Sequence, residues 1–95
     1  RLSLRMVERA LSFAQNIPSD VRACLSDVIS ALNRKDVTDE ELCNAIMSAD
    51  TSGLDRWSKG RAADILCAAS QSVVIRDASW RERIMAAGDK MSITG

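Results

Sequence analysis

The stretch LRMVERALSFA, residues 4–14, carries the pattern that decides the fold. Its apolar side chains recur at steps of three and four residues. They are Leu4, Val7, Ala10, Leu11 and Ala14. Because an α-helix turns once every 3.6 residues, this spacing places all of them on one face. The pattern predicts an amphipathic helix over residues 2–15.

Four more segments show helical patterns, separated by short turns. They run from the turn at residues 16–20 to Arg34, over residues 38–49, over residues 54–71 and over residues 77–90. The third helix opens with a capping box, because Thr38 and Glu41 can each satisfy a free amide of its first turn. Gly60, inside the fourth helix, either lets another helix approach closely or marks a kink. An apolar connector over residues 72–76 precedes the last helix.

One all-α domain of five helices over residues 1–90 is therefore expected, followed by a frayed tail over residues 91–95. When the sequence is shifted along itself and compared, similar segments align, which suggests an internal repeat. A shift of 35 residues aligns Val7, Ala10, Leu11 and Ala14 with Leu42, Ala45, Ile46 and Ala49. A shift of 37 aligns SDVISA (26–31) with ADILCA (63–68), and a shift of 38 aligns Leu42, Ile46 and Ala49 with Trp80, Ile84 and Ala87.

The repeat predicts two and a half helical hairpins stacked as an α-solenoid segment, since a lone hairpin cannot bury both of its faces. A compact helical bundle is the alternative, because any two amphipathic helices with similar stripes can be aligned in this way.

The repeat period and the aligned segments resemble the helical-hairpin repeats of organellar RNA-binding proteins, the octotricopeptide and heptatricopeptide classes. The resemblance covers residues 4–87 and rests on the aligned apolar positions given above. It implies a structural role in an organellar ribosome or an RNA-processing complex.

The composition argues against catalysis. The chain has 95 residues, no histidine, and 13 basic against 13 acidic side chains. Without histidine, neither a Ser-His-Asp nor a Cys-His site can form, nor any zinc site that needs imidazole. Asp27 and Asp64 occupy matching helix positions, but a solvated helix face explains them better than acid–base chemistry does. We expect no enzyme activity, no catalytic residue, no metal and no cofactor.

Two clusters of cations surround the two tryptophans and are the predicted RNA or partner contacts. They comprise Arg56, Trp57, Lys59 and Arg61, and Arg76, Trp80, Arg81 and Arg83. Basic groups beside an aromatic plane can contact phosphates while the ring stacks on a base. In the alternative, the tryptophans pack between helices and the arginine stems cover them. A protein contact through the same surface is a third possibility.

Partners and compartment follow from weaker features. Other protein subunits and RNA are the expected partners, and a protein–protein adaptor or scaffold without RNA contact is the alternative, since the net charge is zero. No membrane or small-molecule partner is expected.

Cys24, Cys43 and Cys67 suggest buried thiols in a reducing intracellular compartment. The segment RLSLRMV (1–7) is typical of the end of an organellar presequence, which would place the protein in a mitochondrial or other organellar matrix, as a piece of a longer chain.

Overall fold

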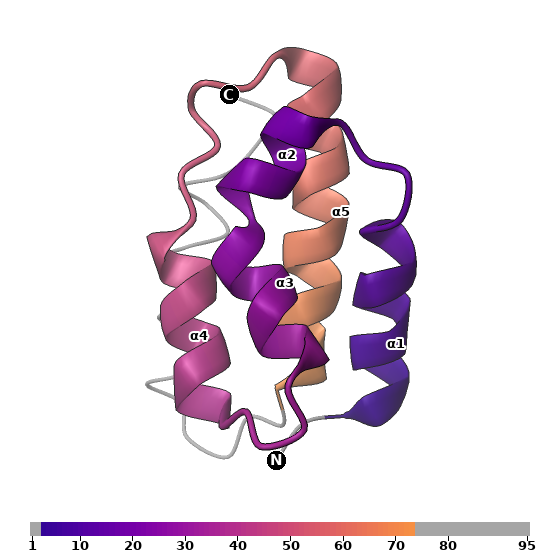
Figure 1. Ribbon diagram of the computed structural model, residues 1–95, viewed down its shortest axis with the longest axis vertical. Helices are drawn as coiled ribbons and strands as arrows, with labels where there is room; N and C mark the ends of the chain where they lie inside the picture. Colours follow the sequence, from indigo (N-terminus) through magenta and orange to yellow (C-terminus); the bar gives the residue numbers. More distant parts are fainter. Residues whose placement is uncertain (1–2, 74–95) are drawn as a thin grey trace.

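The computed structural model describes residues 3–73, and these residues form five α-helices (Figure 1). The helices are α1 (Leu4–Phe13), α2 (Ser19–Cys24), α3 (Ser26–Asn33), α4 (Asp39–Ser48) and α5 (Arg56–Ser72). The all-α prediction is confirmed. The helix predicted over residues 77–90 and the tail over residues 91–95 lie outside the described residues.

The predicted second helix is divided in two. Leu25 separates α2 from α3 with a backbone φ of −106° and ψ of 16°. The ladder nevertheless continues across it, because Leu25 N–H donates to Val21 O at 3.0 Å and Ile29 N–H donates to Leu25 O at 2.9 Å. The result is a bend at a fully buried leucine rather than a loop, and neither proline nor glycine is present there to announce it.

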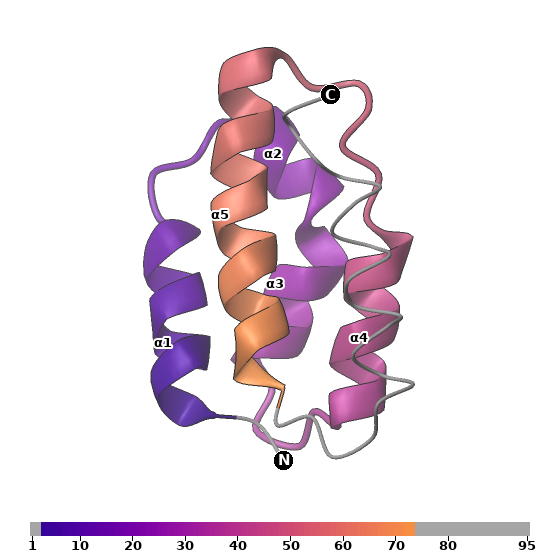
Figure 2. The ribbon, with the colours of Figure 1, turned by 180° about the vertical axis from the view of Figure 1, so that it is seen from behind.

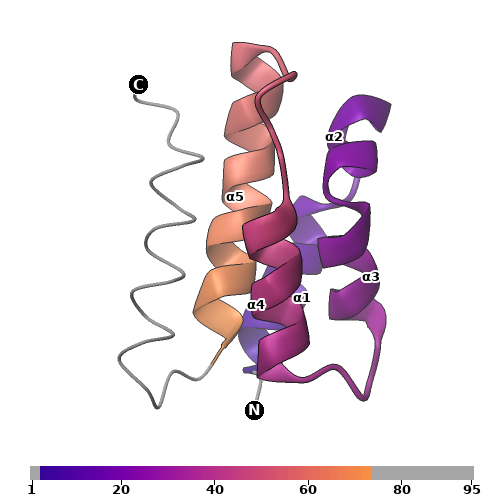
Figure 3. The ribbon, with the colours of Figure 1, turned by 90° about the vertical axis from the view of Figure 1, so that its left-hand side faces the viewer.

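Among residues 3–73 the longest helix is α5, and it packs against each of the other four described helices (Figures 1 and 2). Its most extensive contact is with α1, which runs antiparallel beside it. The backbone N–H of Ser3 donates to Ser72 O at 2.6 Å, which ties the start of α1 to the end of α5. In the view of Figure 3, α5 lies to the left of α4 and α1, and α2 and α3 lie to their right.

The neighbour order bears on the two predicted arrangements. Stacked hairpins would place the first and third predicted helices, now α1 and α4, side by side. Within residues 3–73 these two helices make no contact, and α1 lies against α3 and α5 instead. The described residues therefore form a compact all-α unit, and the choice between stacked hairpins and a bundle also involves residues 77–90, which lie outside them.

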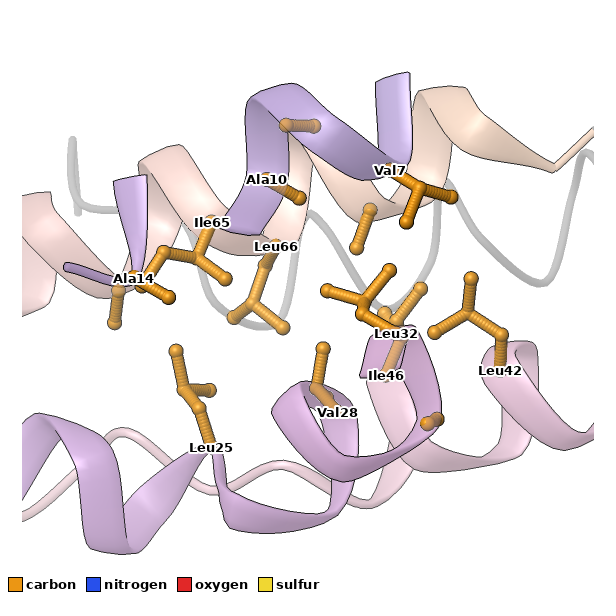
Figure 4. Close-up of a cluster of buried hydrophobic side chains, with 14 of the residues drawn as sticks. Val7, Ala10, Ala14, Leu25, Val28, Leu32, Leu42, Ile46, Ile65 and Leu66 are labelled. Atoms are coloured by element: carbon orange, nitrogen blue, oxygen red, sulfur yellow. The ribbon is translucent and has the colours of Figure 1, made fainter. Parts of the chain in front are cut away.

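The core is built from branched aliphatic side chains of α3, α4 and α5, closed on one side by small residues of α1 (Figure 4). The labelled members are Val7, Ala10, Ala14, Leu25, Val28, Leu32, Leu42, Ile46, Ile65 and Leu66. Ala10 and Ala14 are buried, and so are Ala62 and Ala69 of α5. Short side chains on both helices allow α1 and α5 to approach closely, since interaxial distance depends on the side chains at the contact.

Gly60 does not serve the close helix approach that the sequence suggested. A Cβ atom added to Gly60 would meet no atom within 4 Å, the φ angle of Gly60 is not positive, and α5 continues unbroken through this residue.

We therefore expect Gly60→Ala to raise the free energy of unfolding by about 0.5–1 kcal/mol, because glycine loses more backbone freedom in a helix than alanine does. Urea titration followed by circular dichroism measures this, and an unchanged or lower midpoint would contradict it.

Candidate nucleic-acid interface

Trp57 lies in the first turn of α5, next to the residues that cap this helix. The carboxylate of Asp55 accepts a hydrogen bond of 2.7 Å from the backbone N–H of Ser58, which also lowers the pKa of Asp55. Ser58 is buried at 2% exposure, and its neighbour Trp57 projects outward with 65% of its surface exposed. The alternative in which Trp57 packs between helices is therefore wrong.

Arg61 lies one turn after Trp57 and covers part of its indole. The guanidinium carbon of Arg61 is 5.9 Å from the centroid of the ring, which is a cation–π distance. The Arg61 side chain is half-buried, and its Nε atom is enclosed with no hydrogen-bond partner among the described residues. Trp57 nevertheless remains 65% exposed, so most of its surface is open to solvent.

Two further cations flank this pair: Arg56 is exposed and Lys59 is half-buried. Over residues 55–64 the three cations Arg56, Lys59 and Arg61 are set against the two carboxylates Asp55 and Asp64, a local net charge of +1. The structure thus places four of the eight predicted contact residues in the first turns of α5, and of the three cations it is Arg61 that lies over the Trp57 ring.

The other four predicted contact residues lie outside the described residues. They are Arg76, Trp80, Arg81 and Arg83.

A second arginine–aromatic pair lies on α1, and the sequence analysis missed it. The guanidinium carbon of Arg9 is 5.5 Å from the centroid of the Phe13 ring. The signal that could have revealed it is the spacing of four residues, which places two side chains on the same helix face. Trp57 and Arg61 have the same spacing.

The cysteine and aspartate expectations had different outcomes. Cys43 is buried and Cys24 is half-buried, but Cys67 is exposed, so its predicted burial is wrong. Cys67 lies on the solvent side of α5, one turn after the exposed Asp64 and one turn before the exposed Gln71. Asp27 and Asp64 are both exposed, as a solvated helix face requires.

The end of the fold opposite Trp57 carries an ion-pair cluster that joins α3 to α4 (Figure 1). Arg34 binds Asp36 at 3.1 Å and also pairs with Glu41, whose backbone N–H donates to the capping hydroxyl of Thr38. Hydrogen bonds from Arg34 lower the pKa of both carboxyls below their ordinary values of 3.8 and 4.5, and the two carboxylates raise the pKa of Arg34.

This cluster predicts a pH dependence of stability. Carboxyls with lowered pKa values stabilise the fold above their ordinary pKa, and the stabilisation is lost as the pH falls below about 4.5. We expect Arg34→Gln to make the thermal midpoint less sensitive to pH between about pH 6 and pH 3, because the two carboxyls return toward their ordinary pKa values. Thermal scans over that range measure it, and an unchanged slope would contradict the assignment.

Other classes of site find little support in the described part of the chain. No group of three or more potential ligands among histidine, cysteine, aspartate and glutamate is placed to hold a metal ion in residues 3–73. None of the helices described there combines the length and the apolar character needed to cross a membrane. The chain matches no protein-family model, no curated protein and no solved structure, so its own geometry has to carry the functional argument.

Proposed function

We propose that this domain is a non-enzymatic RNA-binding module that contacts RNA through the first turns of α5. The observation that carries the proposal is Trp57, an indole that is 65% exposed and has Arg61 over part of its ring. A side chain of this size gains most from burial, so its exposure at a capped helix start is better explained by a ligand than by folding.

The neighbouring cations suit a nucleic acid in particular. An unpaired base can stack on the open part of the Trp57 ring, while Arg56, Lys59 and Arg61 approach the phosphates on either side. Since the chain as a whole has no net charge, attraction to RNA would be local to this end of α5. The resemblance to organellar helical-hairpin repeats supports an RNA of an organellar ribosome or RNA-processing complex as the ligand.

A protein–protein adaptor is the second candidate function. Tryptophan and arginine are the residues that most often dominate the binding energy of protein interfaces, and a net charge of zero suits a protein partner as well as it suits RNA. The two candidates differ in their response to salt, because only the nucleic acid releases condensed counterions when it binds.

The test is the affinity of the full chain for single-stranded RNA at several salt concentrations. Three phosphate contacts predict a slope of log K against log salt of about −2, and Trp57→Ala is expected to weaken binding by about fivefold to a hundredfold. Lys59→Glu should also weaken binding and flatten the slope. Lys35→Glu is the matched control, because Lys35 is exposed between α3 and α4, away from Trp57.

The outcomes separate the two candidates. Weakening by Trp57→Ala and Lys59→Glu but not by Lys35→Glu supports the RNA proposal. Absence of RNA binding, or an affinity that responds to neither salt nor these substitutions, would refute it and leave the adaptor as the better candidate.

A further inference from the structure

The Arg9–Phe13 pair on α1 has the same construction as the Arg61–Trp57 pair on α5. In each, an arginine lies four residues from an aromatic residue on the same helix, with its guanidinium carbon within 6 Å of the ring centroid. Arg9 is exposed and Phe13 is half-buried, so part of this second pair also faces solvent.

The Phe13 end of α1 lies beside the first half of α5, which carries the Trp57–Arg61 pair. The helices α1 and α5 are antiparallel neighbours, and the hydrogen bond from Ser3 to Ser72 sets their register (Figures 1 and 2). Because each residue advances a helix by about 1.5 Å, moving ten residues along α1 from Ser3 and ten residues back along α5 from Ser72 reaches the same level. Phe13 is therefore level with Ala62, next to Arg61, and Arg9 is level with Leu66, while Trp57 lies about 7–8 Å beyond Phe13 along the axis.

The cations of the two helices suit a phosphate backbone that crosses from α1 to α5. Arg9 on α1 adds a fourth cation to Arg56, Lys59 and Arg61 on α5. The axes of packed helices are roughly 8–10 Å apart, so a strand of a few nucleotides is long enough to reach both pairs.

We infer that the Arg9–Phe13 end of α1 extends the RNA-contact surface, and that the ligand is a single strand with unpaired bases at both rings. This inference rests on the proposed function and specifies its ligand. A base that is paired within a helix leaves its stack only at a cost in free energy, so duplex RNA can contact the cations but binds the rings less well than a single strand does.

The experiment compares a single-stranded RNA with a duplex of the same sequence, using the full chain and three variants. Arg9→Glu and Phe13→Leu are each expected to weaken single-strand binding by about fivefold or more, through loss of a phosphate contact or of a stacking surface. The matched control is Arg5→Glu, the same charge change at another exposed position of α1, one turn further from Phe13. It should change the affinity less than twofold.

Thermal unfolding of each variant separates weaker binding from weaker folding. Arg9 is exposed, so Arg9→Glu should keep the wild-type midpoint even if Phe13→Leu lowers it. Preference for the single strand together with a loss specific to Arg9→Glu would support the inference.

Two results would overturn it. Duplex RNA bound as tightly as the single strand would show that no unpaired base is needed. Arg9→Glu binding equal to that of Arg5→Glu would remove α1 from the surface. In both cases the proposed function stands if Trp57→Ala still weakens binding, whereas absence of any RNA binding by the wild-type chain refutes both proposals.

Discussion

Leu25→Ala is expected to lower the free energy of unfolding by about 2–5 kcal/mol, which is a large part of the stability of a small domain. Leu25 is fully buried at the bend between α2 and α3, where its side chain faces the core together with Val28 (Figure 4). Truncation removes apolar contacts and leaves a cavity that the bent backbone fills only in part. Urea titration followed by circular dichroism measures the loss.

Leu4→Ala is the matched control for this change. Leu4 is 75% exposed at the start of α1, and removing the same atoms there should change the free energy of unfolding by less than about 0.5 kcal/mol. Equal effects of the two substitutions would contradict the packing described for Leu25.

Ala10→Leu is expected to destabilise the domain by about 1–3 kcal/mol, because it overpacks the contact between α1 and α5. Ala10 has no exposed surface and lies on the helix that makes the most extensive contact with α5. Three additional carbon atoms at this position would force the two helices apart or drive neighbouring side chains from their preferred rotamers.

The control for overpacking is Ala23→Leu, since Ala23 is an exposed alanine of α2. Thermal unfolding should show a lower midpoint for Ala10→Leu and a nearly unchanged one for Ala23→Leu. A midpoint for Ala10→Leu at or above that of the wild type would mean that α1 and α5 are not closely packed.

The helices themselves were predictable because their apolar stripes are local. The stripe through Val7, Ala10 and Ala14 is buried, and the capping box at Thr38 and Glu41 opens α4 as expected. The bend at Leu25 was not predictable, since its flanking residues would all fit an unbroken helix. Packing of the side chain against other helices, rather than local preference, accompanies the bend.

The order of neighbouring helices was also beyond the sequence pattern. An amphipathic stripe states which face of a helix is buried but not which partner covers it. The sequence aligns α1 with α4, whereas in residues 3–73 the helices in contact with α1 are α3 and α5.

For the candidate site, the sequence indicated which residues lie close together on α5, but it did not indicate which of them are exposed. The pairing of Arg61 with Trp57 follows directly from helical spacing, but the exposure of Trp57 does not, because a tryptophan usually lies mostly inside a fold. The arginine–aromatic pair at Arg9 and Phe13 lies on the same helix as the apolar stripe but outside that stripe. Its relevance depends on α1 lying beside α5, which is a long-range property of the fold.

The central proposal is that RNA contacts the exposed indole of Trp57, and the fluorescence of that indole tests the proposal most directly. The chain has two tryptophans, so Trp80→Phe leaves Trp57 as the single emitter and keeps an aromatic ring at position 80. Titration of this variant with single-stranded RNA should quench the emission to saturation, with a midpoint that rises steeply with salt. Emission that stays unchanged at RNA concentrations that saturate binding would contradict the assignment of Trp57.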